Sequence, residues 1–213
     1  LTGNQNPHHV MRQELHPPIT ARHVRIHPHS WNGSICMRVE LIGNSDHTHE
    51  LGMGNQKIED DEISASSVLA GQFFQEEEEK LFSAFNTRLD SDTLYRAWCA
   101  GAQDTQQYLQ IDLKYTHHVV AIVTQGQHRT GHESWVTEYS VSYSQKSESW
   151  EWYSDNEDIK VLTGNQNPHH VMRQELHPPI TARHVRIHPH SWNGSICMRV
   201  ELIGNSGEYE PRP

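Results

Sequence analysis

The chain has 213 residues, 34% of them hydrophobic, and a net charge of −10 with histidine counted as neutral. This acidic balance argues against nucleic acid or an anionic membrane surface as an electrostatically held partner. The apolar runs are only a few residues long, so no segment resembles a signal peptide or a membrane-spanning helix.

One stretch of the sequence occurs twice without a single change. Residues 1–45 and 162–206 are identical, and the second copy follows the first at an offset of 161 residues (162 − 1). A period of this size is that of a whole domain and not of a short solenoid repeat. The sequence therefore predicts a C-terminal fragment of a preceding identical repeat at 1–45, a complete domain at 46–206, and a tail or linker at 207–213.

Alternating apolar residues predict short β-strands along the chain, and no helical period is sustained. In the first copy the alternation is weak at 9–15 and clearer at 22–27 and 35–41. The second copy repeats these patterns and supplies the closing strands. The segment between the copies has strand patterns at 63–67, 108–113, 118–124, 135–143 and 149–153. Short strands at such spacing indicate an all-β sandwich or jelly roll.

Ten short motifs come in the order found in a known family. They are LGM at 51–53, ISASS at 63–67, RLD at 88–90, AWCA at 97–100, YLQIDL at 108–113, TQG at 124–126, WVTEYSVSYS at 135–144, GNQN at 164–167, PPITARHVRI at 178–187 and SICMRVELIG at 195–204. By these motifs the chain resembles the discoidin domain, or coagulation factor V/VIII C-type domain, with a pattern most similar to that of discoidin-domain receptors. The resemblance implies an eight-stranded antiparallel jelly-roll barrel with loops projecting at one end.

The resemblance also implies a disulfide between Cys99 and Cys197, although two buried free thiols are the alternative. Cys36 is the equivalent of Cys197 in the first copy. Many members of the family join their ends with a further cysteine pair, before LGM and after VELxG. This chain has His49-Glu50 and Asn205 at those places, so we expect no disulfide clasp between its ends.

Ligand binding is expected at the loops, as the resemblance implies. The ligand-binding residues expected are Phe73 and Phe74, which follow ISASS, and a group that follows TQG: His128, Arg129, His132, Glu133 and Trp135. Aromatic rings stack on sugars or fill interface pockets, while charged groups orient polar ligands. Four glutamates at 76–79 disfavour lipid, and Gln127 and Val68 depart from the receptors' collagen-binding pattern. The alternatives are a solvated loop without a ligand and phenylalanine rings packed beneath their own loop.

The 18 histidines invite a metal interpretation. His184, Arg186 and His188 share one strand face, but no spacing matches a closed zinc site and the arginine disfavours a cation. We therefore expect an exposed polar face, no metal and no cofactor, although the glutamate run could attract calcium. A histidine-rich interface that responds to pH is a further hypothesis. Asn32 and Asn193 each begin a glycosylation sequon.

No catalytic motif is present, so the sequence predicts a protein that is not an enzyme. We expect an extracellular adhesion or recognition module that binds a glycan or an extracellular protein through its loops, as part of a tandem-repeat protein. The alternative is a structural subunit of an extracellular filament or matrix, assembled head to tail. Residues 1–45 would then contact neighbouring identical repeats or exchange strands with them, because identical strands fit the same position.

Overall fold

The computed structural model describes residues 3–4, 6, 8–13, 15, 19, 21, 23–41, 48–69, 82–89, 96–128, 131 and 133–206. The chain divides into two compact units, Leu1–Leu41 and Ile42–Pro213. Four predicted ligand-binding residues lie outside the described residues: Phe73, Phe74, Arg129 and His132. The predicted tail at 207–213 also lies outside them.

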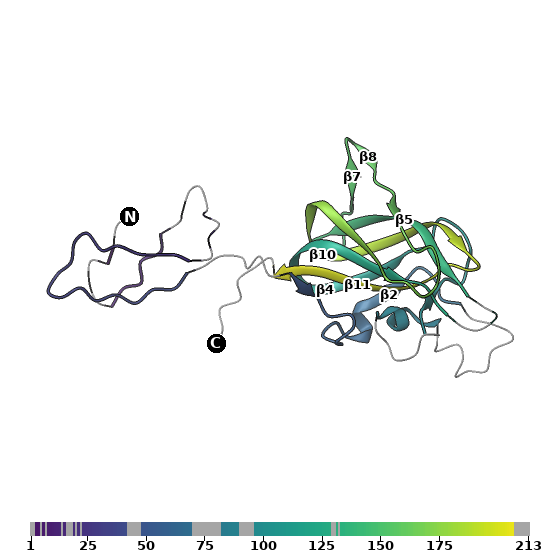
Figure 1. Cartoon of the computed structure of the whole chain (residues 1–213), viewed down its shortest axis with the longest axis horizontal. Helices are drawn as coiled ribbons and strands as arrows, with labels where there is room; N and C mark the ends of the chain where they lie inside the picture. The colour runs from purple at the N-terminus through teal and green to yellow at the C-terminus, as the bar shows by residue number, and fades with distance from the viewer. Residues whose placement is uncertain are drawn as a thin grey trace. The chain divides into compact units, whose positions relative to one another are not determined.

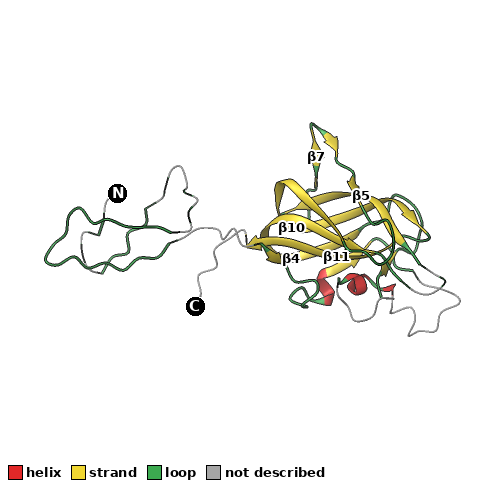
Figure 2. Ribbon diagram, in the orientation of Figure 1, coloured by secondary structure: helices red, strands yellow, loops and turns green. Residues whose placement is uncertain are grey.

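The larger unit is an antiparallel β-sandwich with little helix, which confirms the predicted all-β class (Figure 1). Its strands are β1 (His49–Glu50), β2 (Ile63–Ala65), β3 (Trp98–Cys99), β4 (Leu109–Gln125), β5 (Trp135–Ser144), β6 (Glu151–Trp152), β7 (Ser154–Asp155), β8 (Asp158–Ile159), β9 (Leu162–Thr163), β10 (Met172–Asn193) and β11 (Cys197–Ser206). Among the described residues, two short 3-10 helices, η1 (Asp60–Glu62) and η3 (Ala84–Thr87), lie at one side of the strands (Figure 2). The predicted count of eight strands is not confirmed and stays a prediction, because several of the strands named here are only two residues long.

Two long strands organise the sheet, whose main path is β1-β11-β4-β10-β5-β6. Strand β4 runs for 17 residues and joins the two patterns predicted at 108–113 and 118–124. Its first residues pair with β2, and its later ones pair with β11. Strand β10 runs for 22 residues and pairs with β4 and β5. The closing strands of the second copy therefore hold the sandwich together along most of its length.

Alternation builds the core, as the sequence predicts. In β4, Leu109, Ile111 and Leu113 are buried, and the residues between them are partly exposed. Strand β11 adds Met198, Val200 and Leu202. Burial of such side chains stabilises the fold by roughly 1.5–3 kcal/mol for each one removed from water. No helix in the described part of the chain is long and apolar enough to cross a bilayer.

The first and last segments of the larger unit's sequence meet through backbone pairing and a buried carboxylate. In the antiparallel pair β1–β11, His49 lies opposite Gly204. Glu201, which is buried, accepts hydrogen bonds from the N–H groups of Met53 (3.2 Å) and Gly54 (2.7 Å). Burial raises the pKa of Glu201, and these backbone donors oppose the rise. These bonds tie the segment at 53–54 to β11.

The first copy differs from the second in spite of its identical sequence. None of the described residues within 1–41 lies in a helix or strand, so the strand predicted at 35–41 is wrong, and so is the one predicted at 22–27 over its described residues 23–27. The apolar side chains differ accordingly: Leu202 is 0% exposed, whereas its counterpart Leu41 is 61% exposed. Strands need partners to satisfy their backbone groups and to cover their apolar faces. The sandwich partners supply both to the second copy.

Candidate functional site

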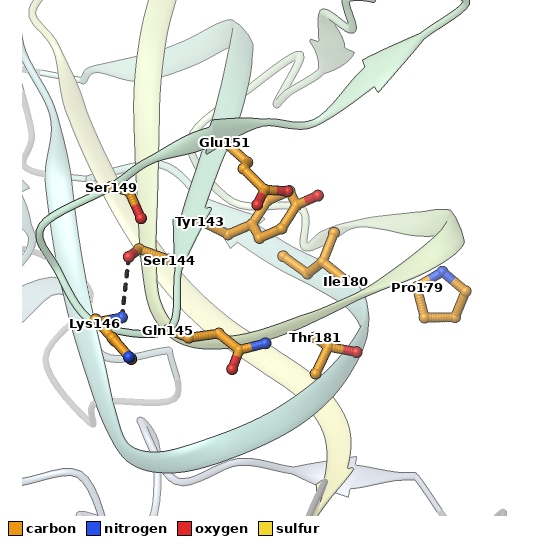
Figure 3. Close-up of a pocket in the computed structure, with 9 residues that line it drawn as sticks. All are labelled: Tyr143, Ser144, Gln145, Lys146, Ser149, Glu151, Pro179, Ile180 and Thr181. Carbon is orange, nitrogen blue, oxygen red and sulfur yellow. Dashed lines mark hydrogen bonds between the residues drawn. The ribbon is translucent and has the colours of Figure 1, made fainter.

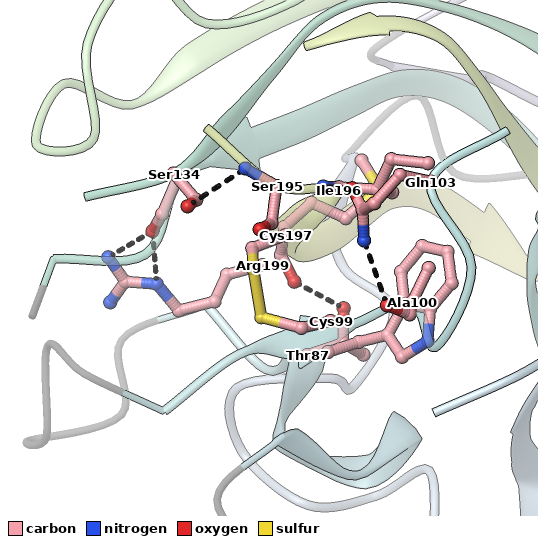
Figure 4. The surroundings of a disulfide bond; sticks show 12 residues. Thr87, Cys99, Ala100, Gln103, Ser134, Ser195, Ile196, Cys197 and Arg199 are labelled. Atoms are coloured by element: carbon pink, nitrogen blue, oxygen red, sulfur yellow. Dashed lines mark hydrogen bonds between the residues drawn. A yellow bond between two sulfur atoms is a disulfide. The ribbon is translucent and has the colours of Figure 1, made fainter. Parts of the chain in front are cut away.

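A disulfide joins Cys99 of β3 to Cys197 of β11, which confirms the predicted bridge (Figure 4). The two residues face each other in the antiparallel register and are buried. Beside them the Thr87 hydroxyl donates a hydrogen bond to the carbonyl of Met198 (3.2 Å). Cys36 is free and exposed. The bridge fixes the start of β11. Arg199 of the same strand then bonds to the loop end of the sandwich, at Gly126.

The loop at 127–134 begins and ends at a closed pair of backbone hydrogen bonds. The N–H of Gln127 donates to the carbonyl of Ser134 (2.8 Å), and the N–H of Ser134 donates to the carbonyl of Gln127 (3.1 Å). Arg199, which is buried, donates from Nε (2.9 Å) and an Nη (2.8 Å) to the carbonyl of Gly126. A charged guanidinium makes strong hydrogen bonds when it is buried. The base of this loop is therefore fixed by the interior of the sandwich.

The next loop, at 165–170, packs directly against the first. A side chain at Gly126 would place its Cβ 2.8 Å from Cα of Pro168, so only glycine allows this approach. The Asn165 side-chain amide donates to the carbonyl groups of Thr124 (3.1 Å) and His170 (2.7 Å). These bonds hold the backbone of the second loop at the end of β4.

Three polar side chains from these two loops meet. Nδ1 of His128 lies 3.3 Å from Oε1 of Glu133, and the ring centroids of His128 and His169 are 4.0 Å apart. The side chains of His128 and Glu133 are 29% and 48% exposed, so the group is open to solvent. We call His128, Glu133 and His169 the loop-end triad.

The structure thus brings together two of the predicted ligand-binding residues, His128 and Glu133, and adds His169, which is outside the predicted set. Trp135, the third described member of the predicted set, is half-buried at the start of β5. Its ring is therefore partly committed to the fold. Residues 128 and 169 are 41 positions apart in the chain (169 − 128), and no local motif signals their contact.

The sequon at Asn193 lies at the same end of the sandwich. Asn193 is exposed where β10 ends, and Ser195 donates its backbone N–H to the hydroxyl of Ser134 (3.1 Å) (Figure 4). Asn32, its counterpart in the first copy, is also exposed. Exposure permits glycosylation at either position, and that modification stays a prediction. A glycan on Asn193 would stand beside the loop-end triad.

The histidine-rich face of β10 is more covered than expected, so the expectation of an exposed polar face is wrong. His184 is buried and His188 is half-buried. Trp152 lies over His188 with ring centroids 4.6 Å apart, and the guanidinium of Arg186 lies 3.7 Å from the ring centroid of Trp150. The tryptophans of the β5–β6 region form this cover, which a strand pattern alone does not reveal.

Burial, with smaller effects of the charges on Arg186 and His190, lowers the pKa of His188 to about 4. The ordinary pKa of an unfolded-chain histidine is about 6.5, so the neutral form is favoured in the folded state. This contribution to stability is complete above pH 6.5 and is lost as the pH falls toward 4. From pH 7 to 4 we expect the free energy of unfolding to fall by about 3 kcal/mol through this group.

Urea unfolding at both pH values checks this expectation for the wild type, His188→Asn and the matched variant His27→Asn. His188→Asn should lose the corresponding part of the acid sensitivity, whereas His27→Asn should behave as the wild type. Equal acid sensitivity in all three proteins would contradict the assignment to His188.

The sandwich also has an open pocket of about 600 Å³. Figure 3 shows the residues that line it. Tyr143, Lys146 and Glu151 belong to its lining. Strand β5 runs from Trp135 to Ser144, and at about 3.4 Å per residue these two positions are roughly 30 Å apart. Burial and the neighbouring Glu151 raise the pKa of Tyr143. The pocket is therefore distinct from the predicted ligand-binding loops.

An antiparallel sandwich with polar side chains gathered on loops at one end has the architecture of a jelly-roll domain. The model of the F5/8 type C domain matches residues 62–202. This chain belongs to the F5/8 type C, or discoidin, domain family, as the sequence motifs predict.

Two relatives illustrate the relationship. Coagulation factor V of Mus musculus is 36% identical over 209 residues, which cover 96% of this chain and 9% of that protein. EGF-like repeat and discoidin I-like domain-containing protein 3 of Homo sapiens is 36% identical over 213 residues, which cover 97% of this chain and 43% of that protein. The chain therefore spans less than half the length of either relative.

Solved structures show the same fold. Discoidin II of Dictyostelium discoideum superposes with a TM-score of 0.54 at 25% identity, over 67% of this chain and 54% of that one. The family 32 carbohydrate-binding module of Clostridium perfringens NanJ, in complex with galactose, gives a TM-score of 0.51 at 13% identity, over 74% and 99%. At 13% identity this second likeness concerns the fold alone.

Proposed function

We propose that this chain is an extracellular, non-catalytic recognition module that binds a glycan or a protein at the loop end of its sandwich. The observation that carries the proposal is the loop-end triad, in which imidazole and carboxylate groups from two rigidly based loops converge and stay open to solvent. The family supports a binding role. The Cys99–Cys197 disulfide supports an oxidising, extracellular setting.

The test compares the effect on ligand binding of substitutions at the loop-end triad and at the distant pocket. The full chain is screened on an array that carries galactose-terminated and other glycans together with extracellular matrix proteins. For each ligand found, His128→Ala/Glu133→Ala should weaken binding at least about tenfold, the size typical of an interface hot spot. The control Lys146→Ala/Glu151→Ala alters the distant pocket and should retain binding. Binding that survives the first pair of substitutions and is lost with the second would contradict the proposal, as would a wild type that binds nothing.

A second candidate function, the structural subunit of an extracellular assembly, is favoured by the first copy. Its apolar side chains are exposed, and its sequence is that of strands which close the sandwich elsewhere in the chain. The match to coagulation factor V covers 96% of the chain and so includes most of this copy, which supports its origin in a neighbouring domain. We propose that residues 1–45 can occupy, in another chain, the position that 162–206 occupies here.

The register of the sheet defines what this exchange would look like. Gly43 would take the place of Gly204 opposite His49, and Cys36 would take the place of Cys197 opposite Cys99. When the exchange occurs between chains, each molecule can both give and receive closing strands. Contacts of this head-to-tail kind extend into filaments unless the geometry closes a ring.

A cysteine variant tests the exchange. In Cys197→Ser, Cys99 has lost its partner, and exchange between chains should produce a Cys36–Cys99 disulfide that appears as a ladder of linked chains on a non-reducing gel. Cys36→Ser/Cys197→Ser is the control and should give monomers. A Cys36–Cys99 bond within a single chain would show closure without assembly, and Cys197→Ser monomers without this bond would contradict exchange altogether.

A further inference from the structure

The loop-end triad has the composition of a metal site. Within the described part of the chain, His128, Glu133 and His169 are the one group of three such residues whose potential ligand atoms lie close together, all within 4.8 Å of one another. Two come from the loop at 127–134 and the third from the loop at 165–170. No short spacing in the sequence matches a zinc site, because this group forms only when the two loops pack together.

The backbone around the triad is held in place by bonds that do not use its side chains. The side-chain amide of Gln125 donates to the carbonyl of His169, and the N–H of His169 donates to Oδ1 of Asn167 (3.0 Å). The base of the other loop is fixed by the Gln127–Ser134 backbone pair. The donor atoms thus project from two supported backbones, an arrangement that lowers the cost of ordering a site around an ion.

We propose that His128, Glu133 and His169 bind a zinc ion. Two imidazoles and one carboxylate form a donor set suited to Zn²⁺, whereas Ca²⁺ and Mg²⁺ prefer ligands that are all oxygen. Bonds of about 2.0–2.2 Å in a tetrahedron place ligand atoms roughly 3.3 Å apart. The present separations must therefore shorten, which side-chain rotation allows because Glu133 and His169 are exposed.

Three protein ligands leave a fourth position of the zinc ion open. A carboxylate or hydroxyl oxygen of a bound glycan or protein can fill that position, and this second step rests on the proposed function. Zinc binding itself does not rest on it, because the three protein ligands are sufficient to hold the ion.

The duplicated sequence supplies a control. His8 is the counterpart of His169 in the first copy and lies in the same local sequence, Asn-Pro-His-His. His128 and Glu133 have no second copy, because they lie in the segment that occurs once. A site that depends on the packing of two loops should need His169 and not His8. A weak affinity of the many histidines for metal would affect both positions alike.

Isothermal titration of the full chain with zinc chloride tests the proposal, in a Cys36→Ser background that removes the exposed thiol. We expect one zinc ion per chain. His128→Ala and His169→Ala should each lower the affinity by at least about tenfold, since even the loss of an outer-shell partner costs 10–100-fold. His8→Ala should bind as the background does, and calcium chloride should give no binding at this site.

Cobalt(II) provides a second readout, because its visible absorption reports nitrogen and oxygen ligation directly. The background and His8→Ala should show this spectrum, and Glu133→Gln should change it even if an alanine variant unfolds. The proposal is overturned if no saturable zinc binding occurs, or if binding is equal in the His128→Ala, His169→Ala and His8→Ala proteins. Glycan and protein ligands are absent from these titrations, so a negative result leaves the proposed recognition function standing. If zinc binds but the ligand screen finds no ligand, only the proposed recognition function is overturned.

Discussion

Removal of the disulfide through Cys99→Ser/Cys197→Ser should lower the free energy of unfolding by about 2–5 kcal/mol, because the bridge closes a long loop in the unfolded chain. The two cysteines are 98 positions apart in the sequence and lie on directly opposed residues of β3 and β11. Urea unfolding followed by tryptophan fluorescence measures the change. The loop at 127–134 should also become less ordered, since Arg199, two residues after Cys197, holds its base.

Cys36→Ser is the matched control for this prediction. Cys36 is free and exposed, and it lies in the same local sequence as Cys197. Its substitution should leave the unfolding curve within about 0.5 kcal/mol of the wild type. A cost as large for Cys36→Ser as for the double variant, or no cost for either, would contradict the role given to the bridge.

The second large effect is expected from Leu202→Ala, which should cost about 2–5 kcal/mol of stability, as is usual for a leucine removed from a packed core. Leu202 is fully buried in β11, where its side chain belongs to the main apolar cluster. Leu41→Ala makes the identical change in an identical local sequence. Because Leu41 is mostly exposed, its substitution should alter the free energy of unfolding by no more than about 0.5 kcal/mol.

These two variants separate local sequence from tertiary environment. Equal losses of stability would mean that both copies are packed against a core, and a larger loss for Leu41→Ala would mean that the first copy closes the sandwich. Thermal unfolding monitored by circular dichroism is sufficient to rank them, and the wild type in the same buffer provides the reference.

Much of the sandwich could be predicted from the sequence, because each strand buries one face and apolar residues therefore occupy every second position. Leu109, Ile111 and Leu113 are buried as their spacing predicts. The merging of two predicted strands into β4 could not be read in this way. Periodicity shows which side chains point inward, but it does not show where a strand bends to reach a second partner.

The first copy shows the limit of local pattern most directly. Its alternation at 35–41 is that of β11, yet those residues form no strand, because strand formation depends on neighbours that sequence periodicity does not supply. The Cys99–Cys197 bridge could be predicted through the family resemblance. Spacing alone left two free thiols as an alternative.

The candidate site was partly predictable. His128 and Glu133 follow a family motif and lie five positions apart on one loop, so a search of the loops finds both. His169 joins them only through the packing of Gly126 against Pro168, a tertiary contact. The glycine of the TQG motif is the most useful signal in the sequence, since a glycine permits close approach between loops and so places distant side chains together.

Amide hydrogen exchange read by mass spectrometry tests most directly whether one copy closes the sandwich and the other does not. Once the Cys99–Cys197 bridge is reduced before digestion, peptides from 23–41 and 184–202 have the same mass, so each shared peptide reports both copies at once. We predict two isotope envelopes of equal area at every exchange time, one exchanging within the shortest times and one protected as expected for β10 and β11. A single protected envelope would show that both copies are folded into cores and would contradict this account of the fold, as would a single envelope that exchanges fully at once.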